Sequence, residues 1–148
     1  MDMSSSSGFS RGNEGTGELP AEYSFSQIVH KKILILGDVS TGKTSFTARL
    51  LLDALSISKP KEITVIDMAP ERMFHDGKVI GGKITDMVKL PSTVRILQPK
   101  KVYAPRLTAK NRDELLHQVE QNATSIEESI GQYLNDVTPI LFINDLSL

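Results

Sequence analysis

One short segment constrains the fold of this chain more than any other, namely residues 37–44, which read Gly-Asp-Val-Ser-Thr-Gly-Lys-Thr. An apolar run, Ile-Leu-Ile-Leu at residues 33–36, lies directly before it. The stretch behind it carries apolar side chains at helical spacing, which are Phe46, Leu50, Leu51 and Leu55. We therefore predict a strand over residues 33–36, a tight loop, and a helix from Lys43 to about Ile57.

The residue types of this loop point to phosphate chemistry. A loop around a β-phosphate must turn its backbone N–H groups inward, and Gly37 and Gly42 reach the required conformations without a Cβ penalty. Lys43 can place its ammonium between the β- and γ-phosphates, and the Thr44 hydroxyl is the expected protein ligand of Mg²⁺. The positive end of the helix dipole adds to the same anion site. The predicted binding residues are Gly37, Asp38, Val39, Ser40, Thr41, Gly42, Lys43, Thr44 and Ser45.

A second glycine-rich stretch, residues 77–83, repeats the spacing between glycine and lysine. Ile84 stands where the hydroxyl residue should be, and no apolar run precedes the stretch. We interpret it as a flexible glycine loop rather than a second phosphate site.

Length and composition set further limits. With 148 residues and 39% hydrophobic content, the chain has room for one core;. The net charge of −1 gives no general attraction to nucleic acid or to an anionic membrane, so either partner would need a local basic patch;. There are no cysteines, and no apolar stretch approaches the roughly 20 residues of a membrane span;. We expect a cytoplasmic protein without a membrane partner.

The chain divides into two parts. Residues 1–26 are rich in serine and glycine and carry few large apolar side chains, so we predict a disordered tail;. Residues 27–148 form the predicted folded domain. After the helix that follows the loop, we expect a strand at residues 63–66, an irregular excursion over residues 71–91 and a strand at 140–143;. Residues 94–97 and 102–104 are two weak strand candidates, of which only one need belong to the main sheet.

A long helix is predicted after Asn111. It presents one apolar stripe, made of Leu115, Val119, Ala123, Ile126, Ile130 and Leu134;. Strands that alternate with helices favour an α/β fold with a mostly parallel sheet covered on both faces.

Acidic residues at strand ends complete the predicted site. Asp145 follows the apolar strand at residues 140–143, and we predict that it orients Mg²⁺ opposite the Thr44 hydroxyl;. Asp67 follows the strand at residues 63–66, where it could hold metal or accept a proton, or simply cap a turn;. Glu71 is an alternative to Asp67 for that role. Arg106 either binds a phosphate with its guanidinium or is simply a solvated loop residue.

These residues resemble the P-loop NTPase superfamily, through the loop at residues 37–44 and the acid-terminated strand at residues 140–145. The order of strand, loop and helix extends the likeness to most of residues 33–148. The resemblance implies a Rossmann-like three-layer fold and a nucleotide bound with Mg²⁺, but it does not fix the reaction. The loop and residues 65–67, Val-Ile-Asp, are also similar to the polynucleotide 5′-kinase group and to related dimeric ATPases and GTPases.

We predict that the chain binds ATP with Mg²⁺ and hydrolyses it, with Lys43, Asp67 and Asp145 as the catalytic set. Guanine-reading members of the superfamily carry Asp-x-x-Gly and Asn-Lys-x-Asp; residues 145–148 lack the glycine, and residues 111–114 have arginine in place of lysine and end in glutamate. An ATP-dependent phosphotransferase, whose acceptor phosphate would meet the basic residues of the excursion, is the first alternative. A GTP-binding switch or nucleotide-dependent interaction module is the second.

Superfamily members generally continue with further strands beyond the acid strand, whereas this sequence stops at Leu148. We expect either a compact domain that a partner completes or a fragment that is truncated at its C-terminus. The exposed edge of the last strand should then promote self-association.

Overall fold

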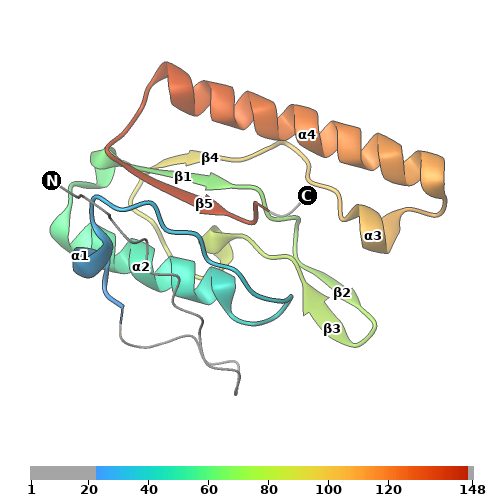
Figure 1. Ribbon diagram of the computed structural model, residues 1–148, viewed down its shortest axis with the longest axis horizontal. Coiled ribbons are helices and arrows are strands. Elements are labelled where there is room, and N and C mark those ends of the chain that lie inside the picture. The colour runs from blue at the N-terminus through green and yellow to red at the C-terminus, as the bar shows by residue number, and fades with distance from the viewer. Residues whose placement is uncertain (1–22, 147–148) are drawn as a thin grey trace, which may run out of the picture.

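The computed structural model describes residues 23–146 and has mixed α/β architecture (Figure 1). Its helices are α1 (Phe25–Ile28), α2 (Lys43–Ile57), α3 (Pro105–Thr108) and α4 (Arg112–Asn135), with two 3₁₀ turns, η1 (Pro60–Glu62) and η2 (Ile84–Asp86). Its strands are β1 (Ile63–Asp67), β2 (Met73–His75), β3 (Lys78–Ile80), β4 (Arg95–Leu97) and β5 (Ile140–Asn144).

Three strands form a parallel sheet in the order β4-β1-β5. Every residue of the central strand β1 is buried, which explains its continuous β-branched sequence;. The register places Val65 opposite Phe142 and Asp67 opposite Asn144. The strands predicted near residues 63–66, 94–97 and 140–143 are therefore confirmed, whereas residues 102–104 form none.

The predicted strand at residues 33–36 is not formed. These residues carry no strand assignment, and Ile33, Leu34 and Leu36 are 50%, 69% and 75% exposed. A strand needs a neighbour that pairs with its N–H and C=O groups, and within the described residues β5 pairs only with β1;. The apolar run is thus an irregular, exposed approach to the loop, and β5 is an edge strand.

Helices cover both faces of the sheet, with α2 on one side and α4 on the other (Figure 1). Leu50, Leu51 and Ala54 of α2 share one core cluster with the β1 and β5 residues that face them, which are Ile63, Val65 and Phe142. Ile126 of α4 packs with Ile66 and Met68 on the opposite face. No helix within residues 23–146 is long and apolar enough to cross a membrane.

The apolar stripe predicted on α4 is only partly buried. Ile126 lies in the core, but Val119 and Leu134 are 39% and 65% exposed. Two polar residues, Gln118 and Asn122, are buried in the first half of the helix instead. This half extends past the sheet in Figure 1, so its inner face meets α3 and the preceding chain rather than the strands.

Residues 23–26, which fall within the predicted tail, belong to the described part of the chain. Phe25 of α1 is buried, and its ring centroid lies 6.0 Å from that of Phe142. The predicted tail falls mostly on residues 1–22, which lie outside the described part of the chain.

A hairpin lies within residues 71–91, which we predicted from the sequence to be irregular. β2 and β3 pair antiparallel, with Phe74 opposite Val79. Asp76 and Gly77 form the two-residue turn and both have positive φ, 48° and 75°. An Asp-Gly pair between short alternating runs is a strong hairpin signal, so residues 77–83 are one hairpin strand and its exit rather than a loose glycine loop.

Candidate functional site

The loop between residue 36 and α2 is built around two left-handed positions. Ser40 and Gly42 have φ values of 64° and 85°, and Gly42 is the N-cap residue of α2. A Cβ at Gly37 would stand 2.9 Å from the Thr41 hydroxyl oxygen, which folds back and donates to the Asp38 carbonyl oxygen at 2.8 Å. The backbone conformation therefore favours glycine at position 42, and a side chain at position 37 would displace the Thr41 hydroxyl;.

Lys43 is the first residue of α2, and its side chain turns back over the loop. Its Nζ donates to the Gly37 carbonyl oxygen at 2.7 Å and also to that of Asp38. Gly42 has no side chain to cap the first N–H groups of the helix;. The loop thus brings an ammonium group close to a helix N-terminus that side chains leave open, a combination that attracts anions.

The first turn of α2 also contacts the excursion. Thr44 is partly buried and Ser45 is exposed. The Ser45 hydroxyl oxygen lies 3.8 Å from the Met87 sulfur, directly after η2. The predicted magnesium ligand Thr44 therefore sits in a turn whose neighbours come from both the loop and the excursion.

Asp67 is fully buried at the carboxyl end of β1 and holds three elements together. Its carboxylate accepts hydrogen bonds from the Ile84 N–H at 2.6 Å, the Asn144 side-chain amide at 2.9 Å and the Ala69 N–H at 3.3 Å. Both carboxylate oxygens are engaged in this way. The bond from the Ala69 N–H agrees with the predicted alternative that Asp67 caps the turn after β1. The geometry therefore favours a positioning role for Asp67 over the proton-accepting or metal-binding role.

Asn144 is the residue of this cluster that the sequence prediction missed. It is buried at the end of β5, next to Asp67 in the sheet register. Its position in the strand could have identified it, because Asn144 lies two residues after the buried Phe142 and so points to the same side of the sheet. A buried amide there needs a partner, and Asp67 is that partner.

Asp145 follows Asn144 and is partly buried, with a left-handed backbone at φ 57°. Asp adopts this region more readily than most residues, yet the conformation is uncommon enough to indicate a local requirement. Figure 1 shows the loop at residues 37–42 and the carboxyl ends of β1 and β5 at the same end of the molecule. Thr44 and Asp145 offer hydroxyl and carboxylate oxygens, the donor types that Mg²⁺ prefers.

Neither of the two secondary candidates bonds to Asp67 or Asn144 within the described residues. Glu71 forms an ion pair with Lys83, so this lysine of the excursion already has an acidic partner. Arg106 is exposed on α3, outside the Asp67 cluster.

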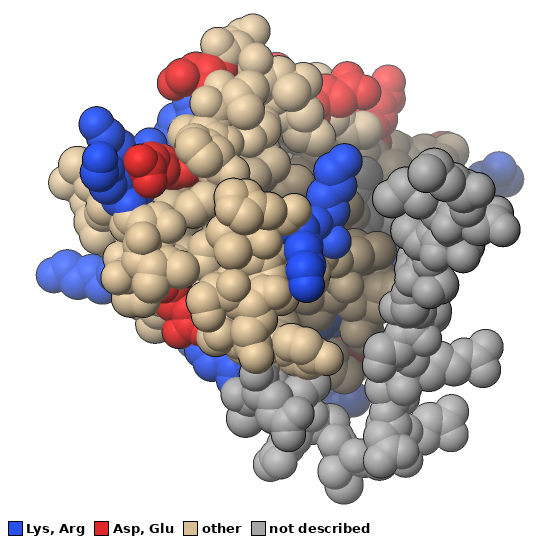
Figure 2. Space-filling view, turned by 60° about the vertical axis from the view of Figure 1, so that its left-hand side comes forward, with Lys and Arg blue, Asp and Glu red and all other residues tan. Residues whose placement is uncertain are grey.

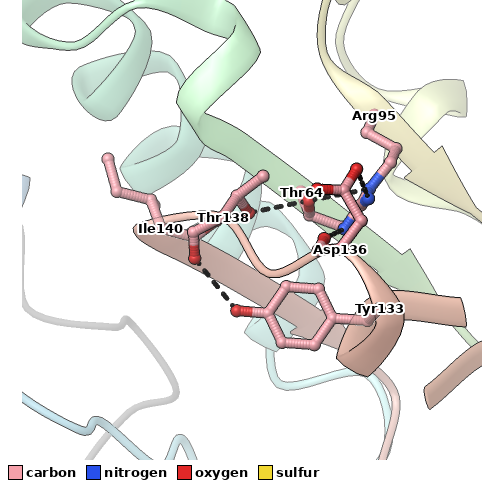
Figure 3. Close-up of polar contacts among 6 residues, drawn as sticks. All are labelled: Thr64, Arg95, Tyr133, Asp136, Thr138 and Ile140. Atoms are coloured by element: carbon pink, nitrogen blue, oxygen red, sulfur yellow. Dashed lines mark hydrogen bonds and ion pairs between the residues drawn. The ribbon is translucent and has the colours of Figure 1, made fainter. Parts of the chain in front are cut away.

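A second polar network, also missed, lies at the amino end of the sheet (Figure 3). Arg95 donates to the Asp136 carboxylate at 2.6 Å and to the Thr64 hydroxyl at 3.2 Å. Thr138 donates to the same Thr64 oxygen at 2.8 Å, and the Arg95 guanidinium lies 5.7 Å from the Tyr133 ring centroid. This network joins β1, β4, the end of α4 and the approach to β5.

Comparison of the chain with protein-family models, curated proteins and solved structures finds no match.

Proposed function

We propose that this chain binds ATP with Mg²⁺ at residues 37–45 and hydrolyses it slowly, in a three-layer fold of the P-loop NTPase type. The observation that carries the proposal is the position of Lys43. Its ammonium lies over the loop at the start of α2, where it donates to two carbonyl oxygens of that loop. A polyphosphate is a stronger acceptor than a carbonyl oxygen and can replace them.

The arrangement of layers agrees with this proposal. A parallel sheet lies between α2 and α4, and the loop lies at the carboxyl end of the strands (Figure 1). Open α/β sheets bind ligands at that end. The sheet of the described residues has three parallel strands, and residues 33–36 do not add a fourth. We propose the P-loop type of fold from the order of loop, helix and parallel strands.

Each residue of the site has a distinct task in this proposal. The backbone N–H groups of residues 42–45 and the Lys43 ammonium bind the phosphates and offset their charge. Thr44 and Asp145 would hold Mg²⁺, which supplies further neutralisation of phosphate charge when bound. Asp67 keeps Asn144 and the excursion in place, so the backbone that leads into Asp145 is fixed.

Two other reactions remain open to the same site. A phosphotransferase would need free basic side chains in the excursion, and the pairing of Lys83 with Glu71 reduces that supply. A GTP-binding switch would be expected to carry Asp-x-x-Gly and Asn-Lys-x-Asp, which residues 145–148 and 111–114 do not match. We therefore place ATP hydrolysis first.

The test is a calorimetric titration of ATP and of GTP, each with and without Mg²⁺, into the full chain. We expect Mg²⁺-dependent binding of ATP that is lost in Lys43→Ala. Lys32→Ala is the matched control, because Lys32 is exposed and lies outside the loop. Release of phosphate is then measured with ATP alone and with an oligonucleotide or a small hydroxyl acceptor added.

The outcomes separate the proposals. Equal, metal-independent binding by the wild type and Lys43→Ala would remove the site assignment. Stronger binding of GTP would favour the switch, and a labelled product that forms only with acceptor would favour the phosphotransferase.

A further inference from the structure

A cluster of positive charge lies outside the phosphate loop, on the segment that includes α3. Residues 98–112, which we call the basic lobe, contain five basic residues and no acidic residue. All five are exposed, and none forms an ion pair within residues 23–146; they are Lys100, Lys101, Arg106, Lys110 and Arg112. The whole chain has a net charge of −1, so this charge is strongly local.

The backbone of the basic lobe is held against α4 by three sets of hydrogen bonds. The Asn122 side chain accepts from the Tyr103 N–H at 2.8 Å and donates to the Tyr103 carbonyl oxygen at 3.0 Å. The Thr108 hydroxyl donates to Gln118 at 2.8 Å, and the Lys110 N–H donates to Glu114 at 2.9 Å. These contacts explain why Gln118 and Asn122 are buried. They hold the backbone that carries the cationic side chains against α4.

The spacing of these anchors gives the length of the lobe. Glu114 and Asn122 are eight residues apart on one helix, which corresponds to about 12 Å at 1.5 Å per residue. One strand of B-DNA carries about one phosphate per 3.4 Å of axis, so a 12 Å stretch of that strand presents roughly three or four. The five cations of the lobe are enough to contact each phosphate of such a stretch.

The position of the lobe agrees with a surface for a partner. Figure 1 shows α3 beyond the carboxyl end of the sheet, beside the first turns of α4. Figure 2 shows a different face, where lysines, arginines and acidic residues are interspersed on a mostly uncharged surface. Two acids follow the lobe directly in sequence. Asp113 is exposed, and Glu114 accepts hydrogen bonds from the Lys110 N–H and the Gln118 side chain.

The surroundings of the cations distinguish between polyanionic partners. Between Ile96 and Leu116 there is no exposed large hydrophobic side chain among the described residues, so the lobe has no apolar anchor for a membrane surface;. Tyr103 is half-buried, and the Lys101 Nζ lies 4.2 Å from its ring centroid. A cation beside an aromatic ring is the combination with which single-strand sites hold a phosphate and its base.

We propose that the basic lobe binds the backbone of a single-stranded nucleic acid. The inference goes beyond the phosphate loop, and it does not require that nucleotide binds there.

The test is fluorescence anisotropy of a labelled, mixed-sequence 20-nucleotide DNA strand with the full chain, at 50 and 200 mM salt and without ATP. If all five cations contact phosphates, affinity should fall roughly a hundredfold between these concentrations. The triple variant K100Q/K101Q/K110Q should bind at least tenfold more weakly, with a salt slope reduced by about 2. The matched control K31Q/K32Q/K61Q removes three exposed lysines elsewhere and should bind like the wild type.

Circular dichroism of each variant shows whether α4 is intact, and Lys43→Ala is included so that the phosphate-loop proposal is tested separately. Retained DNA binding by Lys43→Ala is expected. Equal loss in both triple variants, or no loss in either, would overturn the proposal. It would also be overturned if vesicles of anionic lipid or polyglutamate bound at 200 mM salt as tightly as the oligonucleotide does.

Discussion

Two cationic side chains at opposite ends of the sheet are held in different ways. At the amino end, Arg95 bonds to Thr64 and Asp136, which are 31 and 41 residues away in sequence. At the carboxyl end, Lys43 bonds to carbonyl oxygens only six and five residues away, within its own loop. Partners that come from distant elements are fixed by the fold, whereas local partners can be exchanged while the fold stays intact.

Asp67 lies at the carboxyl end of the sheet, as Lys43 does, but it resembles Arg95 in that distant elements supply its partners. Its partners Ile84 and Asn144 are 17 and 77 residues away. The difference teaches that a charged residue near a ligand site need not act on the ligand. The sequence distance to its partners separates a structural charge from one that is available for binding.

The largest effect should follow from Asp67→Ala. This change leaves buried N–H groups of Ile84, Ala69 and the Asn144 side chain without acceptors, and each costs about 1–3 kcal/mol. We expect a loss of roughly 3 kcal/mol or more in the free energy of unfolding, measured by urea denaturation. Glu127→Ala, at an exposed position of α4, should change it by less than about 0.5 kcal/mol;. Equal stability of the two variants would show that Asp67 does not hold the elements together.

Lys43→Ala should affect binding and leave folding unchanged. The loss of a charge-assisted contact to phosphate costs about 1.5–3 kcal/mol, or roughly 10- to 150-fold in ATP affinity by titration calorimetry. The urea midpoint should remain that of the wild type, because the lysine has only local partners. A large shift of the urea midpoint would show that Lys43 stabilises the fold, as Arg95 does at the amino end of the sheet.

Arg95→Met should lower the stability of the fold and leave ATP binding unchanged, the opposite of Lys43→Ala. The Asp136 side chain is 82% exposed, so the ion pair itself contributes little, and we expect a loss of about 1 kcal/mol in unfolding free energy;. ATP affinity should stay within twofold of the wild type. Weakened ATP binding in a variant that is still folded would mean that the two ends of the sheet are coupled.

The smallest effect is expected for Leu36→Ser. Leu36 is 75% exposed, so its replacement should change the free energy of unfolding by less than about 0.5 kcal/mol;. Leu50→Ser, at a leucine that is 3% exposed, should cost several times more in the same denaturation experiment;. A comparable loss of unfolding free energy in Leu36→Ser would indicate that residues 33–36 are buried in solution, as expected for the predicted strand.

The elements whose signal is local were predictable from the sequence. The helix from Lys43 to Ile57 was predicted with both ends, because a glycine precedes it and Ser-Lys-Pro follows it;. Strands β1 and β5 were predicted from apolar, β-branched runs. The hairpin β2–β3 was missed although Asp76-Gly77 marked it, since the surrounding glycines and lysines obscured the short alternation.

The failures concern pairing rather than local preference. Residues 33–36 and residues 140–143 are nearly equivalent as apolar runs, yet only the second has a hydrogen-bonded neighbour in the described structure. The buried face of α4 was predicted as apolar, but Gln118 and Asn122 are buried because the polar backbone of the basic lobe lies against them.

By itself, the sequence determined the glycine–lysine loop, the helix that follows it, the apolar strands and the acids at their ends, because each depends on neighbours within a few residues. Only the tertiary structure decided which strands pair, that the Asp67 carboxylate bonds to Ile84 and Asn144, and that the basic lobe lies against the first half of α4. Those outcomes depend on groups far apart in the chain, whose meeting no local pattern encodes.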